Sequence, residues 1–310
     1  YEFCCGVASD IEDQEKYTFE QMLTNVMFAL AQSKEASSEN ICFFDEEVHK
    51  KKEFENFIES NMQQALDSQC FEMVLQPKMN LQTNSVIAAE ALVRWRLEDG
   101  TYLPPSSFVD IFEKNRFCSK LDFYMLKKAI QQIRKWIDMG MNPVNISVNQ
   151  SKIVFYHENY ISELKSLLEE YNVSGSYITL EVLESTVIED IDIFNSILTE
   201  VKKLGFSVSL DDFGSGYSSL NVLSKLQIDE LKIDRIFLHT KSEVDNQRTK
   251  WILESIIDIA KKSQILVVVE GVESKQDDLF IKNLGADVGQ GYFYGRPLSI
   301  SAFNDLIETK

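Results

Sequence analysis

Short apolar runs alternate with amphipathic segments along the chain from about residue 71 to its end. The runs have the length and the β-branched content of strands, and the segments between them repeat apolar residues at helical spacing. Eight strands are predicted: Phe71–Met79, Ile87–Trp95, Val144–Val148, Ile178–Leu183, Ser207–Asp212, Glu230–Ile233, Ile265–Glu270 and Gly289–Tyr294. Of the helices between them, one is expected to end at Gly140 and one at Gly205. Another should begin at a capping box of Ser274 and Asp277 and stop at Gly285.

Strands that alternate with helices predict an α/β fold, and eight of them predict a TIM-like (β/α)8 barrel. A short turn around Thr83–Asn84 separates the first two strands, which are therefore expected to form a hairpin. One strand of the barrel should then run antiparallel to its neighbours. An open, doubly wound sheet is the alternative fold.

The first 48 residues follow a different pattern. A helix is predicted over Tyr17–Leu30 and a strand over Ile41–Phe44, and the charged segment Lys50–Phe57 is a predicted helical linker. We therefore expect residues 1–48 to be the end of another domain and residues 49–310 to be the barrel.

The chain is acidic, with 49 Asp and Glu against 31 Lys and Arg and a formal net charge of −18. Such a surface repels nucleic acids and anionic membranes, so no DNA or RNA polymer is expected as a partner. No apolar run approaches the ~20 residues of a membrane-spanning helix, and a cytoplasmic protein is expected. Because the chain begins at Tyr1, a longer protein could carry a membrane anchor upstream.

Catalytic groups of a barrel lie at the carboxyl ends of its strands. The polar residues expected there are Glu90, Asn145, Glu181, Asp211, Asp212, Lys232, Glu270 and Gln290. A carboxylate within an apolar strand is costly to bury unless a cation balances it, and five of them are difficult to explain without metal ions. With only three histidines in the chain, the ligands must be mostly oxygen, which predicts Mg²⁺ or Mn²⁺.

The adjacent pair Asp211–Asp212 could serve two ions ~3.5–4 Å apart, which would clamp an attacking water and a phosphoryl oxygen. An Asp-Asp turn or helix cap is the alternative. Lys232 is interpreted as the one cation among these acids, where it orients the water or stabilises developing charge, or forms a salt bridge to the pair. The Gly-rich loop Phe213–Leu220 is predicted to be a mobile lid.

The signature segments of one family occur in order between residues 71 and 306. They are Gln76-Pro77, Glu90-Ala91-Leu92-Val93-Arg94-Trp95, Asn145-Ile146-Ser147, Glu181 with Glu184-Ser185, Asp211-Asp212-Phe213-Gly214-Ser215-Gly216-Tyr217-Ser218-Ser219-Leu220, Leu231-Lys232-Ile233-Asp234, Glu270-Gly271-Val272-Glu273 and Gln290-Gly291-Tyr292. The chain resembles the EAL-domain cyclic di-GMP phosphodiesterases. It departs from the family at Leu183, where Thr is common, and at Val269, where Ala is common, but neither position supplies a ligand.

The resemblance implies a divalent-metal-dependent phosphodiesterase that hydrolyses cyclic di-GMP to linear pGpG with two Mg²⁺ or Mn²⁺ ions per active site. Ca²⁺ is expected to support binding better than catalysis, and so to inhibit. The implied metal ligands are Glu90, Asn145, Glu181, Asp211, Asp212 and Glu270. The other implied roles are positioning of the water by Lys232 and Gln290, bracing of the lid by Glu273, a guanine contact by Gln76, a phosphate contact by Arg94, and a ligand or structural contact by Asp234.

Two other functions stay open. A receptor that binds cyclic di-GMP without cutting it would be expected to lack Asp211, Asp212, Lys232 or Glu270, and none is missing. An unrelated metal-dependent barrel enzyme is disfavoured by Arg94 and the Gly-rich loop together.

The resemblance also implies a homodimer. Residues 1–48 resemble the C-terminal end of a GGDEF (diguanylate cyclase-like) domain, which implies an upstream sensory or GGDEF domain in the full-length protein.

Overall fold

The computed structural model describes residues 3–9, 17–35, 40–184, 191–214, 220–238 and 243–308. The chain forms two compact units, Tyr1–Gln64 and Ala65–Lys310. Helix α2 (Glu46–Asp67) contains the junction between them, and it also contains the predicted linker Lys50–Phe57.

The smaller unit contains a two-stranded parallel sheet, β1 (Cys5–Val7) and β2 (Ile41–Phe43), beside helix α1 (Phe19–Glu35). Gly6 lets the strand approach the helix closely, because a Cβ on this residue would lie 2.2 Å from the backbone nitrogen of Leu30. The predicted helix and strand of this region are therefore present.

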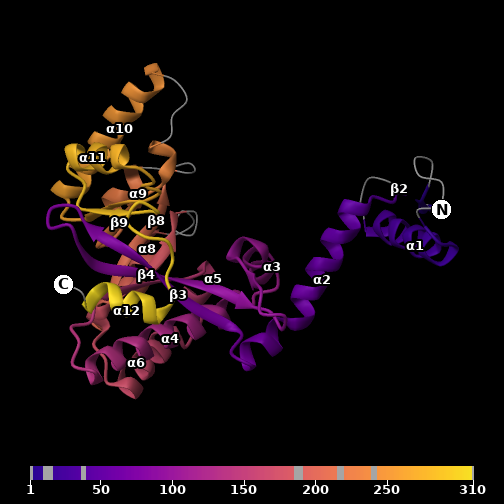
Figure 1. Ribbon diagram of the computed structural model, residues 1–310, viewed down its shortest axis with the longest axis horizontal. Helices are drawn as coiled ribbons and strands as arrows, with labels where there is room; N and C mark the ends of the chain where they lie inside the picture. Colours follow the sequence, from indigo (N-terminus) through magenta and orange to yellow (C-terminus); the bar gives the residue numbers. More distant parts are fainter. Residues whose placement is uncertain are drawn as a thin grey trace. The chain divides into compact units, whose positions relative to one another are not determined.

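The larger unit is a closed barrel (Figure 1). Its strands are β3 (Phe71–Asn80), β4 (Ser85–Arg96), β6 (Asn145–Asn149), β7 (Ile178–Leu183), β8 (Ser207–Phe213), β9 (Glu230–Ile233), β10 (Leu266–Val269) and β11 (Val288–Gln290). Neighbours pair in the order β3-β11-β10-β9-β8-β7-β6-β4, and β3 pairs with β4 to close the ring. Closure confirms the predicted TIM-like barrel and excludes the open sheet.

Strand β3 is the antiparallel strand, since it pairs in that sense with both β4 and β11. The turn that joins β3 to β4 explains this direction. The Asn80 side chain accepts hydrogen bonds from the backbone N–H groups of Gln82 and Thr83, and Asn84 has a φ of 52°. This tight connection reverses the chain and confirms the predicted hairpin.

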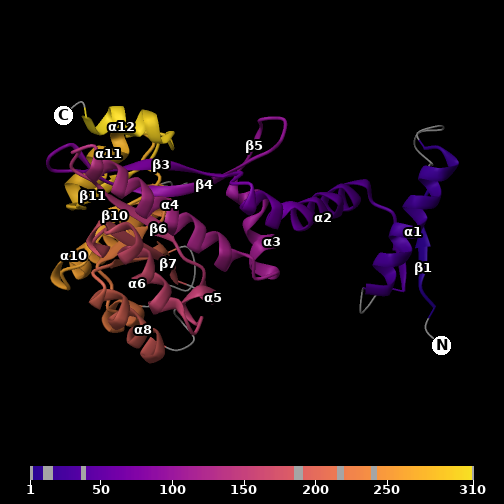
Figure 2. The same cartoon turned by 90° about the horizontal axis from the view of Figure 1, so that it is seen from below.

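Helices surround the strands on the outside of the barrel (Figures 1 and 2). The described α-helices are α3 (Val109–Lys114), α4 (Cys118–Asp138), α5 (Lys152–Phe155), α6 (Tyr160–Tyr171), α8 (Ile191–Lys203), α9 (Leu220–Lys225), α10 (Glu243–Lys262), α11 (Lys275–Leu284) and α12 (Ile300–Glu308). The capping box of Ser274 and Asp277 begins α11, and Gly285, with a φ of 83°, ends it as predicted.

Most predicted strand ends lie within two residues of those in the structure, but two larger differences occur. The eighth strand stops at Gln290 instead of reaching Tyr294, because the backbone N–H groups of Tyr294 and Gly295 turn back to the carbonyl oxygen of Gly291. A short strand, β5 (Tyr102–Leu103), pairs with the end of β4, beyond the residues of β4 that pair with β6. It was not predicted, since two residues are too few to show an alternation of apolar and polar positions.

Candidate active site

The carboxyl ends of the parallel strands meet at one mouth of the barrel, and alternate residues of each strand point inward there. Neighbouring strands are in register at this level: Glu181 lies opposite Asn149, and Asp211 lies opposite Leu183. The side chains that gather at the mouth are Glu90, Asn149, Glu181, Asp211, Lys232, Glu270 and Gln290. All but one of these were predicted, and the exception is Asn149.

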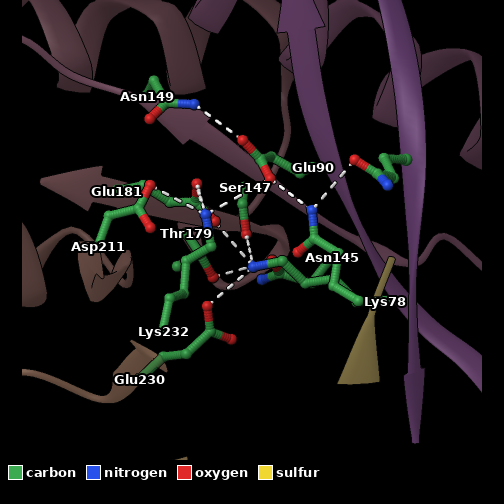
Figure 3. Close-up of polar contacts among 12 residues, drawn as sticks. Lys78, Glu90, Asn145, Ser147, Asn149, Thr179, Glu181, Asp211, Glu230 and Lys232 are labelled. Carbon is green, nitrogen blue, oxygen red and sulfur yellow. Dashed lines mark hydrogen bonds and ion pairs between the residues drawn. The ribbon is translucent and has the colours of Figure 1, made fainter. Parts of the chain in front are cut away.

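Lys232 lies at the centre of this group and is fully buried (Figure 3). Its Nζ atom is 2.8 Å from Glu181, 2.9 Å from Asp211, 2.8 Å from Glu270 and 3.4 Å from Glu90. The prediction that Lys232 lies among the acids is therefore met. The alternative role, a salt bridge to Asp211, is present as well, whereas the part of Lys232 in orienting a water or stabilising charge stays a prediction.

A second buried lysine lies deeper in the barrel, and the interpretation of Lys232 as the one cation among the acids is wrong. Lys78 Nζ is 2.7 Å from Ser147 Oγ, 2.8 Å from Glu181 Oε1 and 2.8 Å from Glu230 Oε1 (Figure 3). Burial alone would lower the pKa of Lys78, but Glu181 and Glu230 raise it above its usual range, so the lysine stays charged. The sequence held one signal for this lysine: it lies two residues after Gln76 on the same strand, so both side chains point to the same face.

The mouth carries more negative charge than its two lysines neutralise. Burial raises the pKa of Glu270 to about 8, and the nearby Asp211 and Glu90 add to the increase while Lys232 opposes it. Burial likewise raises the pKa values of Glu90, Asp211 and Asp212. Burial would raise the pKa of Glu181 too, but the two lysines that contact it lower the value to about 2.

The donor set fits a divalent cation that prefers oxygen. Carboxylate oxygens of Asp211, Asp212 and Glu270 lie within 4.8 Å of one another. Gln290 donates from Nε2 to Glu90 over 2.6 Å, while its Oε1 is buried without a hydrogen-bond partner among the described residues. An unpartnered buried acceptor requires a donor such as a bound water. Excess negative charge, clustered oxygens and this acceptor all suit Mg²⁺ or Mn²⁺ with coordinated water.

Asn145, a predicted metal ligand, lies at the opposite end of its strand. It is the first residue of β6, where its side chain donates to the Ser176 carbonyl and accepts from Thr179. Asn149 ends the same strand and donates to Glu90 Oε1 over 3.1 Å. The two asparagines are four residues apart on one strand, so both side chains point into the barrel and the alternation of the strand could not distinguish them. The residue of β6 at the mouth is therefore Asn149, and the prediction of Asn145 as a metal ligand is corrected.

Substitution of the two asparagines separates their roles. If the mouth carries out the phosphodiester hydrolysis that the resemblance implies, Asn149→Ala should lower the kcat of that reaction roughly 10²-fold, because it removes an oxygen from the mouth and releases Glu90. Asn145→Ala should lower the free energy of unfolding by about 1–3 kcal/mol and leave kcat within about twofold. Steady-state rates and thermal melts of both variants test this. Equal loss of kcat in both would contradict the correction.

The remaining predicted residues surround the opening of the mouth. A cavity of about 240 Å³ is lined by Gln76, Glu90, Asp234, Arg235, Glu270, Gly271, Glu273, Gln290, Gly291 and Tyr292. The Asp234 side chain also accepts from the backbone N–H of Ile236 and so caps the short helix Arg235–Phe237, which is a structural role. Its contact with a ligand stays a prediction. Arg94 is half-buried on β4, where its guanidinium donates to the carbonyl of Val93. Arg235, which sequence reasoning missed, brings a cation to this cavity.

A second cavity of about 200 Å³ lies next to Asn149 and is mostly apolar. Leu92, Pro105 and Val109 line it, and Asp122 of α4 contributes a partly buried carboxyl group. Asp122 Oδ2 accepts from both the N–H and the hydroxyl of Ser151, yet burial raises its pKa to about 7. This cavity was not foreseen, because its lining comes from segments that are far apart in the chain.

Most of the predicted lid falls outside the described residues. Phe213 ends β8 and Gly214 follows it with a φ of 102°, where a Cβ would meet the ring of Phe237 at 2.1 Å. Residues 215–219 of the Gly-rich loop and Ser185 are not among those described. The proposed closing role of this loop therefore stays a prediction.

Comparison with known families identifies the class to which this barrel belongs. The model of the EAL domain matches residues 59–297, which is most of the chain. The chain therefore belongs to the EAL-domain family, as the sequence motifs indicated.

Two relatives align over nearly all of the chain. Cyclic di-GMP phosphodiesterase NbdA of Pseudomonas aeruginosa is 33% identical over 93% of this chain and 36% of its own length. Cyclic di-GMP phosphodiesterase PdeR of Escherichia coli is 28% identical over 96% of this chain and 45% of its own length. The chain thus spans less than half the length of these relatives.

The fold matches solved structures as well. The structure described as PaMucR phosphodiesterase in complex with c-di-GMP has 32% sequence identity, a TM-score of 0.73, and covers 79% of this chain and 99% of its own. Among the described residues, no helix combines the length and apolar character needed to cross a membrane.

Proposed function

We propose that this chain is a divalent-metal-dependent phosphodiesterase that hydrolyses cyclic di-GMP to linear pGpG. The observation that carries the proposal is the ring of Glu90, Glu181, Asp211 and Glu270 around a buried lysine at the mouth of an EAL barrel. The relatives NbdA and PdeR, named as cyclic di-GMP phosphodiesterases, support the choice of substrate.

The proposed metal ligands are Glu90, Asn149, Glu181, Asp211, Asp212 and Glu270. Two Mg²⁺ or Mn²⁺ ions held there would polarise a phosphoryl oxygen and lower the pKa of a water. Lys232 would hold the attacking water against the phosphate and stabilise negative charge that develops on it. The free Oε1 of Gln290 would accept a hydrogen bond from the same water.

The guanine bases of the substrate would occupy the two cavities beside the mouth. A purine base fits the apolar wall of Leu92, Pro105 and Val109, and guanine presents adjacent N–H donors that a carboxylate accepts. Asp122 supplies that carboxyl group. Gln76 and Asp234 line the other cavity and would contact the second half of the ligand, with Arg94 near a phosphate and Glu273 near the lid.

A receptor that binds cyclic di-GMP without hydrolysis is the alternative function. The presence of every proposed ligand and of Lys232 disfavours it. Pairing of two barrels and a sensory or GGDEF-like region upstream stay predictions of the family resemblances, and a cytoplasmic location stays a prediction from the sequence.

Initial rates of cyclic di-GMP loss test the proposal. Purified protein with Mg²⁺ or Mn²⁺ should hydrolyse the ligand, and EDTA should abolish the reaction because the proposed nucleophile is a water whose pKa the bound metal lowers. Ca²⁺ should support ligand binding while turnover falls at least roughly tenfold, since its looser geometry misplaces the water. Equal turnover with EDTA would exclude the metal-dependent reaction, and tight binding without turnover in Mg²⁺ and Mn²⁺ would favour the receptor.

A further inference from the structure

The two carboxylate oxygens of Glu181 are held by different lysines. Oε2 lies 2.8 Å from Lys232 on the side of the mouth, and Oε1 lies 2.8 Å from Lys78 deeper in the barrel. Glu181 and both lysines are fully buried, so solvent does not compete for these contacts (Figure 3). The carboxylate is therefore fixed with one oxygen facing the other acids and one facing away.

Lys78 is itself held in place from three strands. Besides Glu181 on β7, its ammonium group contacts Ser147 on β6 over 2.7 Å and Glu230 on β9 over 2.8 Å. Lys78 comes from β3, which lies across the barrel from these strands in the order of pairing. An ammonium group has three hydrogens, and all three are used by these acceptors. Lys78 can therefore neither leave Glu181 nor move toward the mouth without breaking buried hydrogen bonds.

We propose that Lys78 determines which metal ion the site prefers, because it restricts Glu181 to a single ligand oxygen. The inference rests on the proposed metal site. Lys78 does not touch metal or substrate and is a positioning residue. Lys78 keeps Oε1 turned toward the interior of the barrel, so an ion at the mouth would reach only Oε2 of Glu181, which Lys232 also contacts, together with oxygens of Glu90, Asp211 and Glu270.

Mg²⁺ and Ca²⁺ differ in what they require of a carboxylate. Mg²⁺ demands six near-octahedral ligands at about 2.0–2.1 Å and takes carboxylates through one oxygen. Ca²⁺ accepts about six to eight oxygens at roughly 2.3–2.6 Å, often with both oxygens of one carboxylate. A carboxylate that has lost one oxygen to Lys78 suits the smaller ions, Mg²⁺ and Mn²⁺. Release of that oxygen should favour Ca²⁺.

The test uses a variant that frees Glu181 without changing local charge. The double substitution Lys78→Met/Glu230→Gln removes one buried cation and one buried anion, so the net charge of the buried group is unchanged and Lys232 remains in place as a partner of Glu181. Glu230→Gln alone is the matched control, because its side-chain oxygen can still accept from Lys78 and the lysine still holds Glu181. Dissociation constants for Ca²⁺ and Mn²⁺ are measured by calorimetry without substrate, so the readout does not depend on turnover.

The proposal predicts that the preference for Mn²⁺ over Ca²⁺, as a ratio of dissociation constants, shifts toward Ca²⁺ by fivefold or more in the double variant. The ratio should stay within twofold of wild type in Glu230→Gln. Equal weakening of both ions, or no change, would show that Lys78 has only a structural role and would overturn the inference. If the double variant does not fold, as judged by circular dichroism, Lys78→Met/Glu230→Leu replaces the buried pair with apolar side chains and is scored by the same ratio.

The outcome also separates this inference from the proposed function. A wild-type protein that binds neither ion would remove the metal site and the inference with it. A wild-type protein that binds Mn²⁺, combined with an unchanged ratio in the double variant, would overturn the role of Lys78 and leave the proposed function standing.

Discussion

Lys232→Met is expected to lower kcat by roughly 10³-fold and to leave the affinity for Mn²⁺ equal to or higher than that of wild type. The ammonium group contacts four carboxylates at the mouth, at 2.8 to 3.4 Å. Its loss removes the group that holds the water and stabilises charge on the phosphate. The same loss leaves the acids with more negative charge, which favours a divalent ion.

The control for Lys232→Met is Lys203→Met, a lysine on the outer helix α8 that pairs with Glu200 on the same helix. Its rate should equal that of wild type. Removal of one partner from a buried ion group costs about 3–5 kcal/mol of stability, so thermal melts with and without Mn²⁺ must accompany the rates. A folded Lys232→Met protein with near wild-type kcat would remove Lys232 from the mechanism. A folded variant that no longer binds Mn²⁺ would mean that Lys232 organises the metal ligands.

Glu90→Gln is expected to abolish turnover for a different reason, through loss of metal. The substitution keeps the shape of the side chain and its ability to accept from Gln290, which now donates to Glu90 over 2.6 Å. It removes a full negative charge from a position 3.4 Å from Lys232 at the mouth. We expect Mn²⁺ affinity to fall roughly 10–100-fold and kcat at saturating Mn²⁺ to fall at least roughly 10²-fold.

Glu200→Gln on α8 provides the matched exposed control, and both its metal affinity and its rate should be those of wild type. Calorimetric titration with Mn²⁺ measures the affinity of each variant directly. Retained Mn²⁺ affinity in Glu90→Gln would refute the assignment of Glu90 as a ligand. Lys232→Met and Glu90→Gln should therefore differ in metal affinity, since both variants lose turnover but only Glu90→Gln should lose metal.

The strands and the barrel were predictable because their signals are local. The apolar runs Ile178–Leu183 and Glu230–Ile233 have the bounds in the structure that alternation and composition predicted. The acids stood out in those runs because a carboxylate in an apolar strand is costly. Their convergence followed from the topology of a barrel, where every parallel strand ends at the same mouth.

What the sequence could not reveal is how far along the barrel axis a residue lies. Asn145 and Asn149 share the inward parity, and only the pairing of Asn145 with Ala88 of β4 places it four residues below the mouth. Lys78 follows a proline in a strand and gives no local sign of its three acceptors on other strands. Asp122 lies on a helix, and its hydrogen bonds with Ser151, 29 residues further along the chain, leave no pattern in the local sequence.

The most direct test of the proposed reaction is the mass of its product after incubation with cyclic di-GMP and Mn²⁺ in ¹⁸O-enriched water. Hydrolysis of one phosphodiester bond predicts linear pGpG with a single ¹⁸O on its terminal 5′ phosphate, formed by wild type and absent with EDTA. Intact cyclic di-GMP after full exposure to Mg²⁺ or Mn²⁺, or a product without ¹⁸O, would contradict the assignment of this barrel as a metal-dependent phosphodiesterase.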